Sequence, residues 1–263
     1  MAKIRVDIYL YEHKMVESRS LAQRLVMAGE ILVNGEMVLK PSQQIDDKAK
    51  VEIIKGPKFV SRGGEKLEVG LKSFRLVNLA DRICVDVGSS TGGFTDCLLQ
   101  NGAKKVYAID VGFGILHWKL RNDPRVVVME RTNARNVVSL PDAIDLVTVD
   151  ASFISLKVLL PVIKNWLHAE SQIVMLIKPQ FEAGRKDAAK GAGVIRDPDI
   201  HRKILLETLD FAIMNGFRFE GLIISPLRGP KGNIEFLAHL SVGAEDAREN
   251  IEEVVDSIIS DML

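Results

Sequence analysis

Apolar and polar residues alternate along the chain in two different patterns, and the change between them lies near residue 58. In the first part, Val6, Tyr9 and Leu10 recur at the three- to four-residue spacing that gives a helix one apolar face. A second helix is expected over residues 21–28, where Gly29 ends it. The sequence therefore predicts two short helices at the start of the chain.

A β-hairpin should follow these helices. Two short apolar runs, 31–33 and 37–39, flank Asn34-Gly35, the dipeptide that best tolerates the positive φ angles of a type I′ turn. A further strand is expected at 51–54. Together with the helices, these strands predict a small α+β domain.

A domain boundary is predicted at Gly56-Pro57, because this dipeptide interrupts both helices and strands. We place a first domain at residues 1–58, a linker at 59–64 and a second domain at 65–263.

The second domain alternates strand-like and helix-like segments, which is typical of a doubly wound α/β sheet. Strands are expected at 83–87, 105–110, 126–130, 144–150, 173–178, 219–224 and 234–240. Helices are expected at 65–74, 94–100, 115–121, 155–167, 198–215 and 244–262. Only residues 225–233 join the last two strands, which is too short for a crossover helix, so these strands should be antiparallel. The predicted fold is a Rossmann-like seven-stranded sheet with an antiparallel last strand.

Composition and charge narrow the range of functions. Hydrophobic residues make up 47% and charged residues 27% of the 263 residues, which is ordinary for a globular protein and excludes wholesale disorder. The net charge is 0, with 35 basic and 35 acidic residues. Residues 243–263 hold one basic and seven acidic side chains, which leaves 34 basic against 28 acidic in the rest. An anionic partner is therefore compatible with the neutral total.

Several sequence features point to the cytoplasm. Charged residues occur from Lys3 onward, so the apolar core of a secretory signal peptide is missing. The longest charge-free stretches, such as 87–95, reach about half of the roughly 20 residues that a spanning helix needs. Cys84 and Cys97 are too few for a disulfide framework, and the five histidines are scattered, so we expect a reducing compartment and no metal site.

The strongest local motif runs from Asp86 to Phe94, where a strand ends in a glycine-rich turn and leads into a helix. Glycines let the backbone approach a ligand, and the carboxyl end of such a strand is where these sheets bind ligands. The spacing differs from G-x-G-x-x-G, so a nicotinamide cofactor is not favoured. Asp110 ends the next strand, where an acidic residue can bind ribose hydroxyls. The alternative is a purely structural turn.

The same turn also satisfies G-x-S-x-G, the nucleophile motif of α/β hydrolases, at residues 88–92. That chemistry needs a later histidine on a loop, whereas His239 lies in a predicted strand. A hydrolase would also leave Asp86 without a role, so this interpretation is disfavoured.

Four ionisable residues should meet near the glycine turn: Lys66, Asp150, Lys178 and Glu235. Asp150 and Lys178 each follow an apolar strand, and Glu235 enters the last one. Because the carboxyl ends of neighbouring parallel strands meet at one edge, we expect these charges to converge on the ligand site.

At this point the chain resembles a known family. Arg5-Val6-Asp7, Ser18-Arg19-Ser20-Leu21-Ala22 and Val33-Asn34-Gly35 resemble an S4-like RNA-binding domain. The segment 86–95, with the four ionisable residues above, resembles the cofactor site and K-D-K-E tetrad of FtsJ-like ribose 2′-O-methyltransferases. The two halves, joined at Ser61-Arg62-Gly63-Gly64, together resemble the TlyA family. Its members, also called hemolysin A, methylate cytidine 2′-hydroxyls in ribosomal RNA, which implies 16S RNA, 23S RNA or both as the substrate.

The resemblance implies S-adenosyl-L-methionine as cofactor and ribosomal RNA or ribosomal subunits as partner. Asp110 would bind the cofactor ribose, and Asn133 would lie near the adenine, with Thr132 or Val111 as alternatives. The rest of the implied cofactor site is Asp86, Gly88, Ser89, Ser90, Gly92, Gly93 and Phe94. The RNA phosphate candidates are Arg5, Arg19, Arg24, Arg62, Arg185, Lys186, Lys190 and Arg196. A membrane-lytic protein and a methyltransferase of another RNA remain the alternatives.

Lys178 is the implied activator of the hydroxyl. Lys66 and the cofactor's sulfonium would disfavour a charged Lys178, whereas Asp150 and Glu235 would favour it. We expect Lys178 to orient the hydroxyl and to stabilise negative charge as it develops, with the proton leaving late or to solvent.

Overall fold

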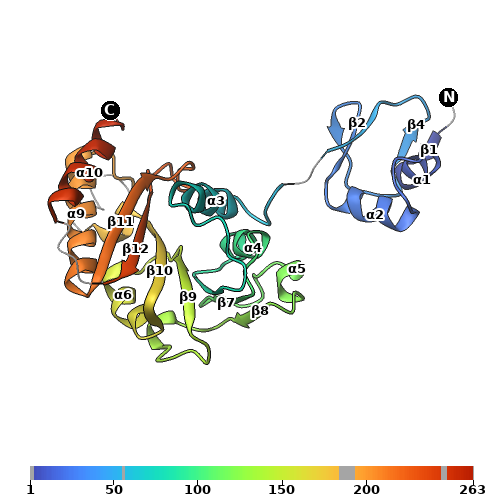
Figure 1. The fold of residues 1–263 in the computed structure, drawn as a ribbon. Coiled ribbons are helices and arrows are strands. Elements are labelled where there is room, and N and C mark those ends of the chain that lie inside the picture. The colour runs from blue at the N-terminus through green and yellow to red at the C-terminus, as the bar shows by residue number, and fades with distance from the viewer. Residues whose placement is uncertain (1–2, 55–56, 184–192, 244–247, 263) are drawn as a thin grey trace. The chain divides into compact units, whose positions relative to one another are not determined.

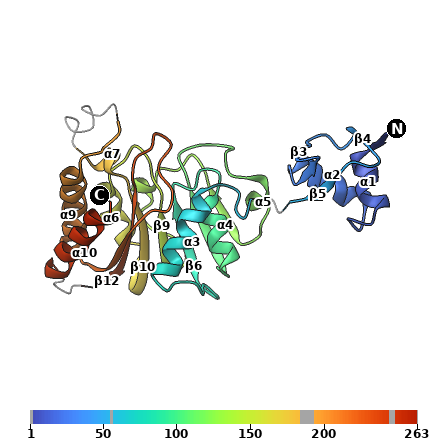
Figure 2. The ribbon, with the colours of Figure 1, turned by 90° about the horizontal axis from the view of Figure 1, so that it is seen from above.

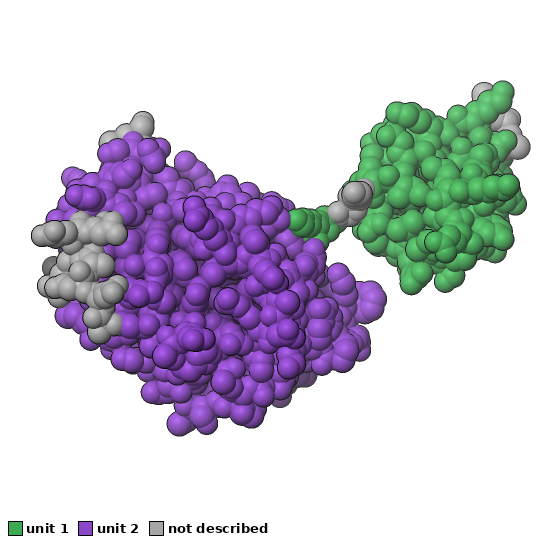
Figure 3. Space-filling model, viewed as in Figure 1, with its two compact units in different colours: residues 1–58 green, residues 59–263 purple. Residues whose placement is uncertain are grey.

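The computed structural model describes residues 3–54, 57–183, 193–243 and 248–262. The chain divides into two compact units, residues 1–58 and 59–263, which Figure 3 colours separately. The first unit has one hydrophobic core and the second has two.

The first unit packs two helices and two small sheets around a core that includes Val6, Leu10 and Val26, all with no exposed surface. Ser18 caps the second helix by accepting a hydrogen bond from the Leu21 backbone. Its helices are α1 (Val6–Glu12) and α2 (Arg19–Met27). Its strands are β1 (Lys3–Arg5), β2 (Ile31–Val33), β3 (Glu36–Met37), β4 (Gln44–Asp46) and β5 (Val51–Ile53).

The predicted hairpin forms, but its second strand is shorter than expected. Asn34 and Gly35 have φ angles of 52° and 85°, as the turn requires. β3 ends at Met37, so the prediction of a strand over 37–39 was wrong in its extent. Val38 still donates its N–H to the Ile31 carbonyl and is buried in the core of this unit. β1 and β4, which pair with each other, were not predicted. Each has three residues, too few to show a pattern.

The second unit contains one seven-stranded sheet in the order β11-β12-β10-β9-β6-β7-β8. β12 is antiparallel to both of its neighbours and the other strands are parallel, which confirms the predicted fold class. The strands are β6 (Ile83–Val87), β7 (Lys105–Ile109), β8 (Val126–Met129), β9 (Ile144–Val149), β10 (Leu167–Ile177), β11 (Phe217–Ile224) and β12 (Phe236–Val242).

Helices cover both faces of this sheet (Figures 1 and 2). One core packs α3 (Gly63–Ser73), α4 (Gly93–Gln100) and α5 (Trp118–Arg121) on the first face. The other packs α6 (Leu156–Lys164), α9 (Pro198–Met214) and α10 (Arg248–Ser260) on the second. Two short segments, α7 (Pro179–Glu182) and the 3-10 helix η1 (Ala134–Asn136), follow β10 and β8. In the described residues, no helix has the length and apolarity needed to cross a membrane.

Three predicted helices differ from the observed ones by three or more residues at one end. The helix expected over 155–167 stops at Lys164, because Trp166 is buried and β10 already begins at Leu167, which pairs with Ile144. The helix expected over 115–121 is shorter and begins at Trp118. The last helix occupies Arg248–Ser260, and residues 244–247 of that prediction lie outside the described residues.

The order of the strands creates the place for a site. After β6 the chain proceeds outward to β7 and β8, and then returns to the other side of β6 as β9. Val87 and Val149, the last residues of β6 and β9, are register partners, so the segments that follow them leave the sheet side by side. Such a switch point is where open α/β sheets bind ligands.

Candidate active site

The turn after β6 is built for close backbone contact. Gly88 has a φ of +83°, and a Cβ at this position would lie 2.8 Å from the Asp150 carbonyl oxygen and 3.0 Å from the Ala151 Cα. Ser90 has a φ of 48° and donates its backbone N–H to Asp110 Oδ2 at 2.8 Å. The glycine thus allows the turns after β6 and β9 to touch, and Asp110 holds the tip of the first one.

Asp86 holds the start of α4 from inside the protein. Its carboxylate is fully buried and accepts hydrogen bonds from the Thr95 backbone N–H at 2.8 Å and from the Thr95 hydroxyl at 2.7 Å. Burial raises the pKa of Asp86 to about 7, and the negative charge of Asp150 adds to this, while the Thr95 hydrogen bonds oppose it. Asp86 lines neither of the hollows at the sheet edge, so it shapes the turn from behind.

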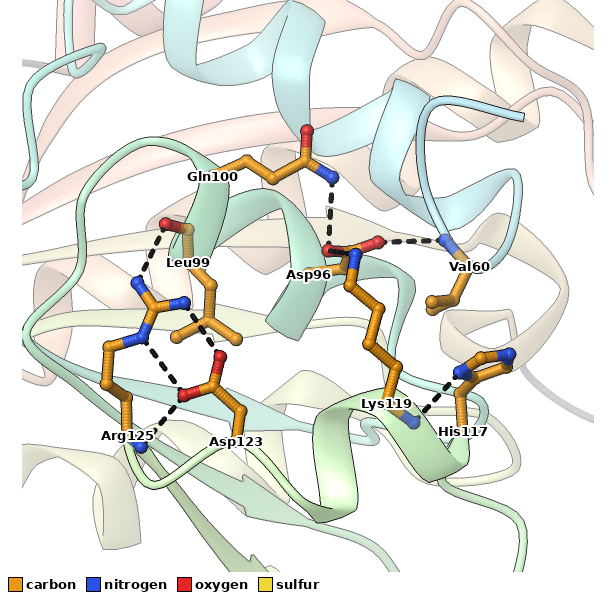
Figure 4. A network of polar contacts seen from close by, with 8 residues as sticks. All are labelled: Val60, Asp96, Leu99, Gln100, His117, Lys119, Asp123 and Arg125. Carbon is orange, nitrogen blue, oxygen red and sulfur yellow. Dashed lines mark hydrogen bonds and ion pairs between the residues drawn. The ribbon is translucent and has the colours of Figure 1, made fainter. Parts of the chain in front are cut away.

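The segment before α3 is fastened to the same turn. Figure 4 shows Asp96 of α4 accepting the Val60 backbone N–H at 2.9 Å, while Gln100 and Lys119 approach its other oxygen at 3.0 and 3.7 Å. A Cβ on Gly93 would lie 2.3 Å from the Ser61 hydroxyl. These contacts place the beginning of α3 directly beside the glycine turn.

A first hollow of about 240 Å³ opens between the glycine turn and α3. Both Lys66 and Asp150 line it, together with Arg62 from the start of α3 and Arg228 from the loop between β11 and β12. Its other lining residues are Ser61, Gly63, Gly88, Ser89, Ser90, Thr91, Gly93, Phe94, Leu227 and Pro230.

A second hollow, of about 250 Å³, lies on the other side of the turn and shares Gly88, Ser90 and Asp150 with the first. Asp110 and Asn133 line it, and so do Thr132 and Val111, the alternatives to Asn133. Its walls also include apolar side chains, among them Val111, Ile115, Phe153, Ile154 and Leu159. An apolar slot with a carboxylate at one side suits a nucleoside, whose base is flat and whose ribose presents two hydroxyls.

The four predicted ionisable residues form two ion pairs. Lys66 Nζ lies 2.6 Å from Glu235 Oε2, and Lys178 Nζ lies 2.6 Å from Asp150 Oδ1. Three of these side chains are at most 12% exposed, and Asp150 is 23% exposed. Because Lys66 and Asp150 face the same hollow, the two pairs meet at one site.

Neighbouring groups fix each pair further. Lys178 Nζ also donates to the Ser152 hydroxyl at 3.0 Å and to the Asp150 carbonyl at 3.3 Å, which uses all three ammonium protons. Gln180 donates to the second oxygen of Glu235 at 3.4 Å. Burying these charges costs desolvation free energy, and buried charges of this kind are often found at functional sites.

Several predicted residues do not line the two hollows. Two of them, Lys178 and Glu235, are connected to the first hollow through their ion pairs with Asp150 and Lys66. Asp86 and Gly92 support the turn, and a Cβ on Gly92 would lie 2.2 Å from a Leu120 methyl carbon. Arg5 and Arg19 belong to the first unit and both pair with the buried Asp7. Three RNA candidates, Arg185, Lys186 and Lys190, lie outside the described residues. Arg24 is exposed on α2, and Arg196 is exposed before α9.

Sequence reasoning missed the return of the β11–β12 loop to the site. Leu227, Arg228 and Pro230 line the first hollow, although they are far along the chain from the glycine turn. It also missed Ser152 and Phe153, which lie two and three residues after Asp150 and line the second hollow. Phe153 has a positive φ of 63° and is 91% exposed. The signal available in the sequence was an aromatic residue three positions after a strand-end aspartate.

The hydrolase interpretation finds no geometric support in the described residues. His239 lies within β12, where its Nε2 is 2.9 Å from Gln172 Oε1. Burial lowers the pKa of His239 to about 4. The described residues also contain no group of three or more His, Cys, Asp or Glu side chains arranged to hold a metal ion.

Comparison with known proteins agrees with the geometry. A model described as FtsJ-like methyltransferase matches residues 59–242, and a model of the S4 domain matches residues 4–51. Hemolysin A of Brachyspira hyodysenteriae is 46% identical over 91% of this chain and 100% of its own length. The 16S/23S rRNA (cytidine-2′-O)-methyltransferase TlyA of Mycobacterium tuberculosis is 40% identical over 98% of both chains.

A solved structure named "Putative hemolysin from Streptococcus thermophilus" is also similar, with a TM-score of 0.73 and 44% identity over 100% of this chain and 98% of that one. The similarity thus covers both units of the chain. The chain belongs to the FtsJ-like methyltransferase family, among the members that also carry an S4 domain and are named TlyA or hemolysin A.

Proposed function

We propose that this chain methylates the 2′-hydroxyl of cytidine in ribosomal RNA, with S-adenosylmethionine as the methyl donor. The observation that carries the proposal is that Lys66 and Asp150, one from each buried ion pair, line the same hollow beside the glycine turn. Relatives named as rRNA (cytidine-2′-O)-methyltransferases support the choice of substrate. Since ribosomes are its target, we place the protein in the cytoplasm.

The lining of the two hollows fits the methyl donor. The second hollow would hold adenosine, with Asp110 at the ribose and Asn133 near the base, and Gly88 and Ser90 lead from there to the first hollow. Gly88 suits this place, since a side chain would collide with the Asp150 backbone. When bound, S-adenosylmethionine supplies an electrophilic methyl group on a positively charged sulfur.

Lys178 and Asp150 would position the hydroxyl. The ammonium of Lys178 is held by the carboxylate, the carbonyl of the same residue and Ser152, and the 3.3 Å bond to the carbonyl is the longest of the three. A substrate hydroxyl can take the place of that bond. The cation then stabilises the negative charge that the hydroxyl oxygen gains as its proton passes to solvent.

Lys66 and Glu235 would hold the other side of the hollow. Glu235 is only 2% exposed, so its carboxylate fixes Lys66 Nζ at 2.6 Å instead of contacting solvent. The fixed Lys66 ammonium can then bind an acceptor oxygen of the target nucleotide. Alignment of this kind supplies about 7–11 kcal/mol in well-oriented reactions.

The test is transfer of labelled methyl from S-adenosylmethionine to 30S and 50S ribosomal subunits from cells that lack this protein. We expect label in 2′-O-methylcytidine with the natural chain and at least 100-fold slower transfer with Lys178→Ala. Lys104→Gln is the matched control, because Lys104 is exposed just before β7, at the opposite edge of the sheet.

Two accompanying measurements separate chemistry from folding. Unfolding in urea and calorimetric titration with S-adenosylmethionine should show that Lys178→Ala folds and still binds the cofactor. If both subunits stay unlabelled while the natural chain binds cofactor, the ribosomal substrate is wrong and other RNAs should be tried. If Lys178→Ala transfers methyl at the natural rate, the role given to Lys178 is wrong.

A further inference from the structure

A separate hollow of about 330 Å³ lies beyond the β11–β12 loop. Two segments build it, residues 194–196 before α9 and residues 228–234 of the loop. The buried Asn233 joins them, since its Oδ1 accepts the Ile195 N–H at 2.9 Å and its Nδ2 donates to the Gly193 carbonyl at 2.9 Å. The hollow therefore has a defined frame.

Three cationic side chains line this hollow: Arg196, Arg228 and Lys231. All three are exposed, and none forms an ion pair with any other residue that the structure describes. Arg228 makes one hydrogen bond, to the Gly232 carbonyl at 3.4 Å. The remaining lining residues are Val194, Ile195, Gly232 and Ile234, so no carboxylate lines the hollow. Its chemistry suits an anion.

The hollow adjoins the candidate active site, because Arg228 lines both. The loop itself is held against the tetrad: a Cβ on Gly229 would lie 2.6 Å from Glu235 Oε1, and the Gly229 N–H donates to the Asn233 carbonyl. The loop thus connects the carboxylate that fixes Lys66 with the cations of the hollow.

The chemistry of the substrate explains such an arrangement. The 2′-hydroxyl of a ribonucleotide sits on the carbon next to the one that bears the 3′-phosphate. A hydroxyl held in the first hollow therefore brings a phosphodiester within a few bonds of it. Guanidinium and ammonium groups are the usual protein partners of phosphate oxygens.

We infer that Arg196, Arg228 and Lys231 form a phosphate subsite for the RNA backbone beside the target nucleotide. The inference rests on the proposed function and specifies how its substrate is held. The subsite positions the RNA strand so that the hydroxyl enters the first hollow, and it takes no part in the chemical step.

The test compares two double variants of the full chain that remove equal charge. Arg196→Gln/Lys231→Gln removes two cations of the subsite that do not line the candidate active site. Arg75→Gln/Lys104→Gln removes two exposed cations at the opposite edge of the sheet, after α3 and before β7. Methyl transfer to ribosomal subunits gives kcat and KM. Fluorescence anisotropy with a labelled single-stranded RNA oligonucleotide, at several salt concentrations, gives RNA affinity without any reaction.

For the subsite variant we expect a KM for subunits at least 10-fold higher, with kcat and the affinity for S-adenosylmethionine unchanged. Its plot of log affinity against log salt should be shallower by about 0.7 for each RNA phosphate that the variant no longer neutralises. The control variant should change both quantities by much less.

Two results would overturn the subsite, and two more would separate it from the proposed function. Equal effects of the two double variants would overturn the inference, and so would a lower kcat with an unchanged KM. If the natural chain methylates subunits but the oligonucleotide binds both double variants alike, the subsite fails while the proposed function stands. If no methyl is transferred but the subsite variant alone loses RNA affinity and salt dependence, the proposed function fails and the subsite stands.

Discussion

The contact between Gly88 and the Asp150 backbone offers a sharp test of how the site is built. Replacing Gly88 with alanine imposes two costs. The φ of +83° disfavours any residue with a Cβ by about 1–2 kcal/mol. The new Cβ would also lie 2.8 Å from the Asp150 carbonyl oxygen, where ordinary contact begins at 3.4 Å, so backbone must move. Overpacking of this kind costs about 1–3 kcal/mol more.

Gly102→Ala is the matched control within the same unit. Gly102 has a φ of +98°, and its Cβ would meet nothing closer than 3.5 Å, so only the conformational cost applies. We expect the free energy of unfolding to fall by about 1–2 kcal/mol in Gly102→Ala and by about 2–5 kcal/mol in Gly88→Ala. Unfolding in urea followed by circular dichroism measures both values.

The functional effect should separate the two variants more clearly than stability does. The Asp150 carbonyl that the new Cβ displaces also accepts a hydrogen bond from Lys178, so Gly88→Ala should disturb both the cofactor turn and the ion pair. A displacement near 1 Å can cost about 100-fold in rate. We expect methyl transfer and cofactor affinity to fall in Gly88→Ala and to persist in Gly102→Ala. Equal stability losses with unchanged cofactor affinity would refute the rigid contact.

Three further predictions concern buried charges. Because the pKa of Asp86 is raised in the folded protein, its contribution to the free energy of unfolding is lost as the pH rises between about 4 and 7. Because the pKa of His239 is lowered, the contribution of His239 is lost as the pH falls through this range. Urea unfolding across this range should therefore show Asp86→Asn losing more stability than the natural chain on acidification, and His239→Gln losing less, by up to about 3 kcal/mol. Lys66→Met should lower the free energy of unfolding by about 3–5 kcal/mol because it leaves the Glu235 carboxylate buried without a cation, and Lys66→Met/Glu235→Leu should recover part of that loss. Asp7→Ala should lower the thermal midpoint of the first unit, measured by calorimetry. Burial alone would raise the pKa of Asp7, but hydrogen bonds from two arginines and a glutamine outweigh burial and hold the pKa below its usual range, so these bonds stabilise the folded unit.

The sequence predicts those parts of the site that directly follow a strand with a clear apolar pattern. Asp110, Asp150 and Lys178 each come directly after a buried apolar run, so the sheet topology alone brings them to one edge. The role of Arg228 was not predictable in this way, because its loop returns to the site through the antiparallel β12 and through contact with Glu235. Likewise, the sequence marks Asp86 as part of a ligand motif, and only burial shows that it supports the turn from behind.

Some cations of the second unit are held in buried ion pairs and others are unpaired, and these two kinds suit different roles. The two lysines of the tetrad are each neutralised by a carboxylate, so they add little to the long-range attraction of RNA. Arg196, Arg228 and Lys231 have no such partner among the described residues and face solvent. The unpaired cations can therefore attract and position a polyanion, while the paired ones keep a fixed geometry for the reaction. A neutral chain can bind RNA on these terms, because the balance of charge at each site matters more than the total.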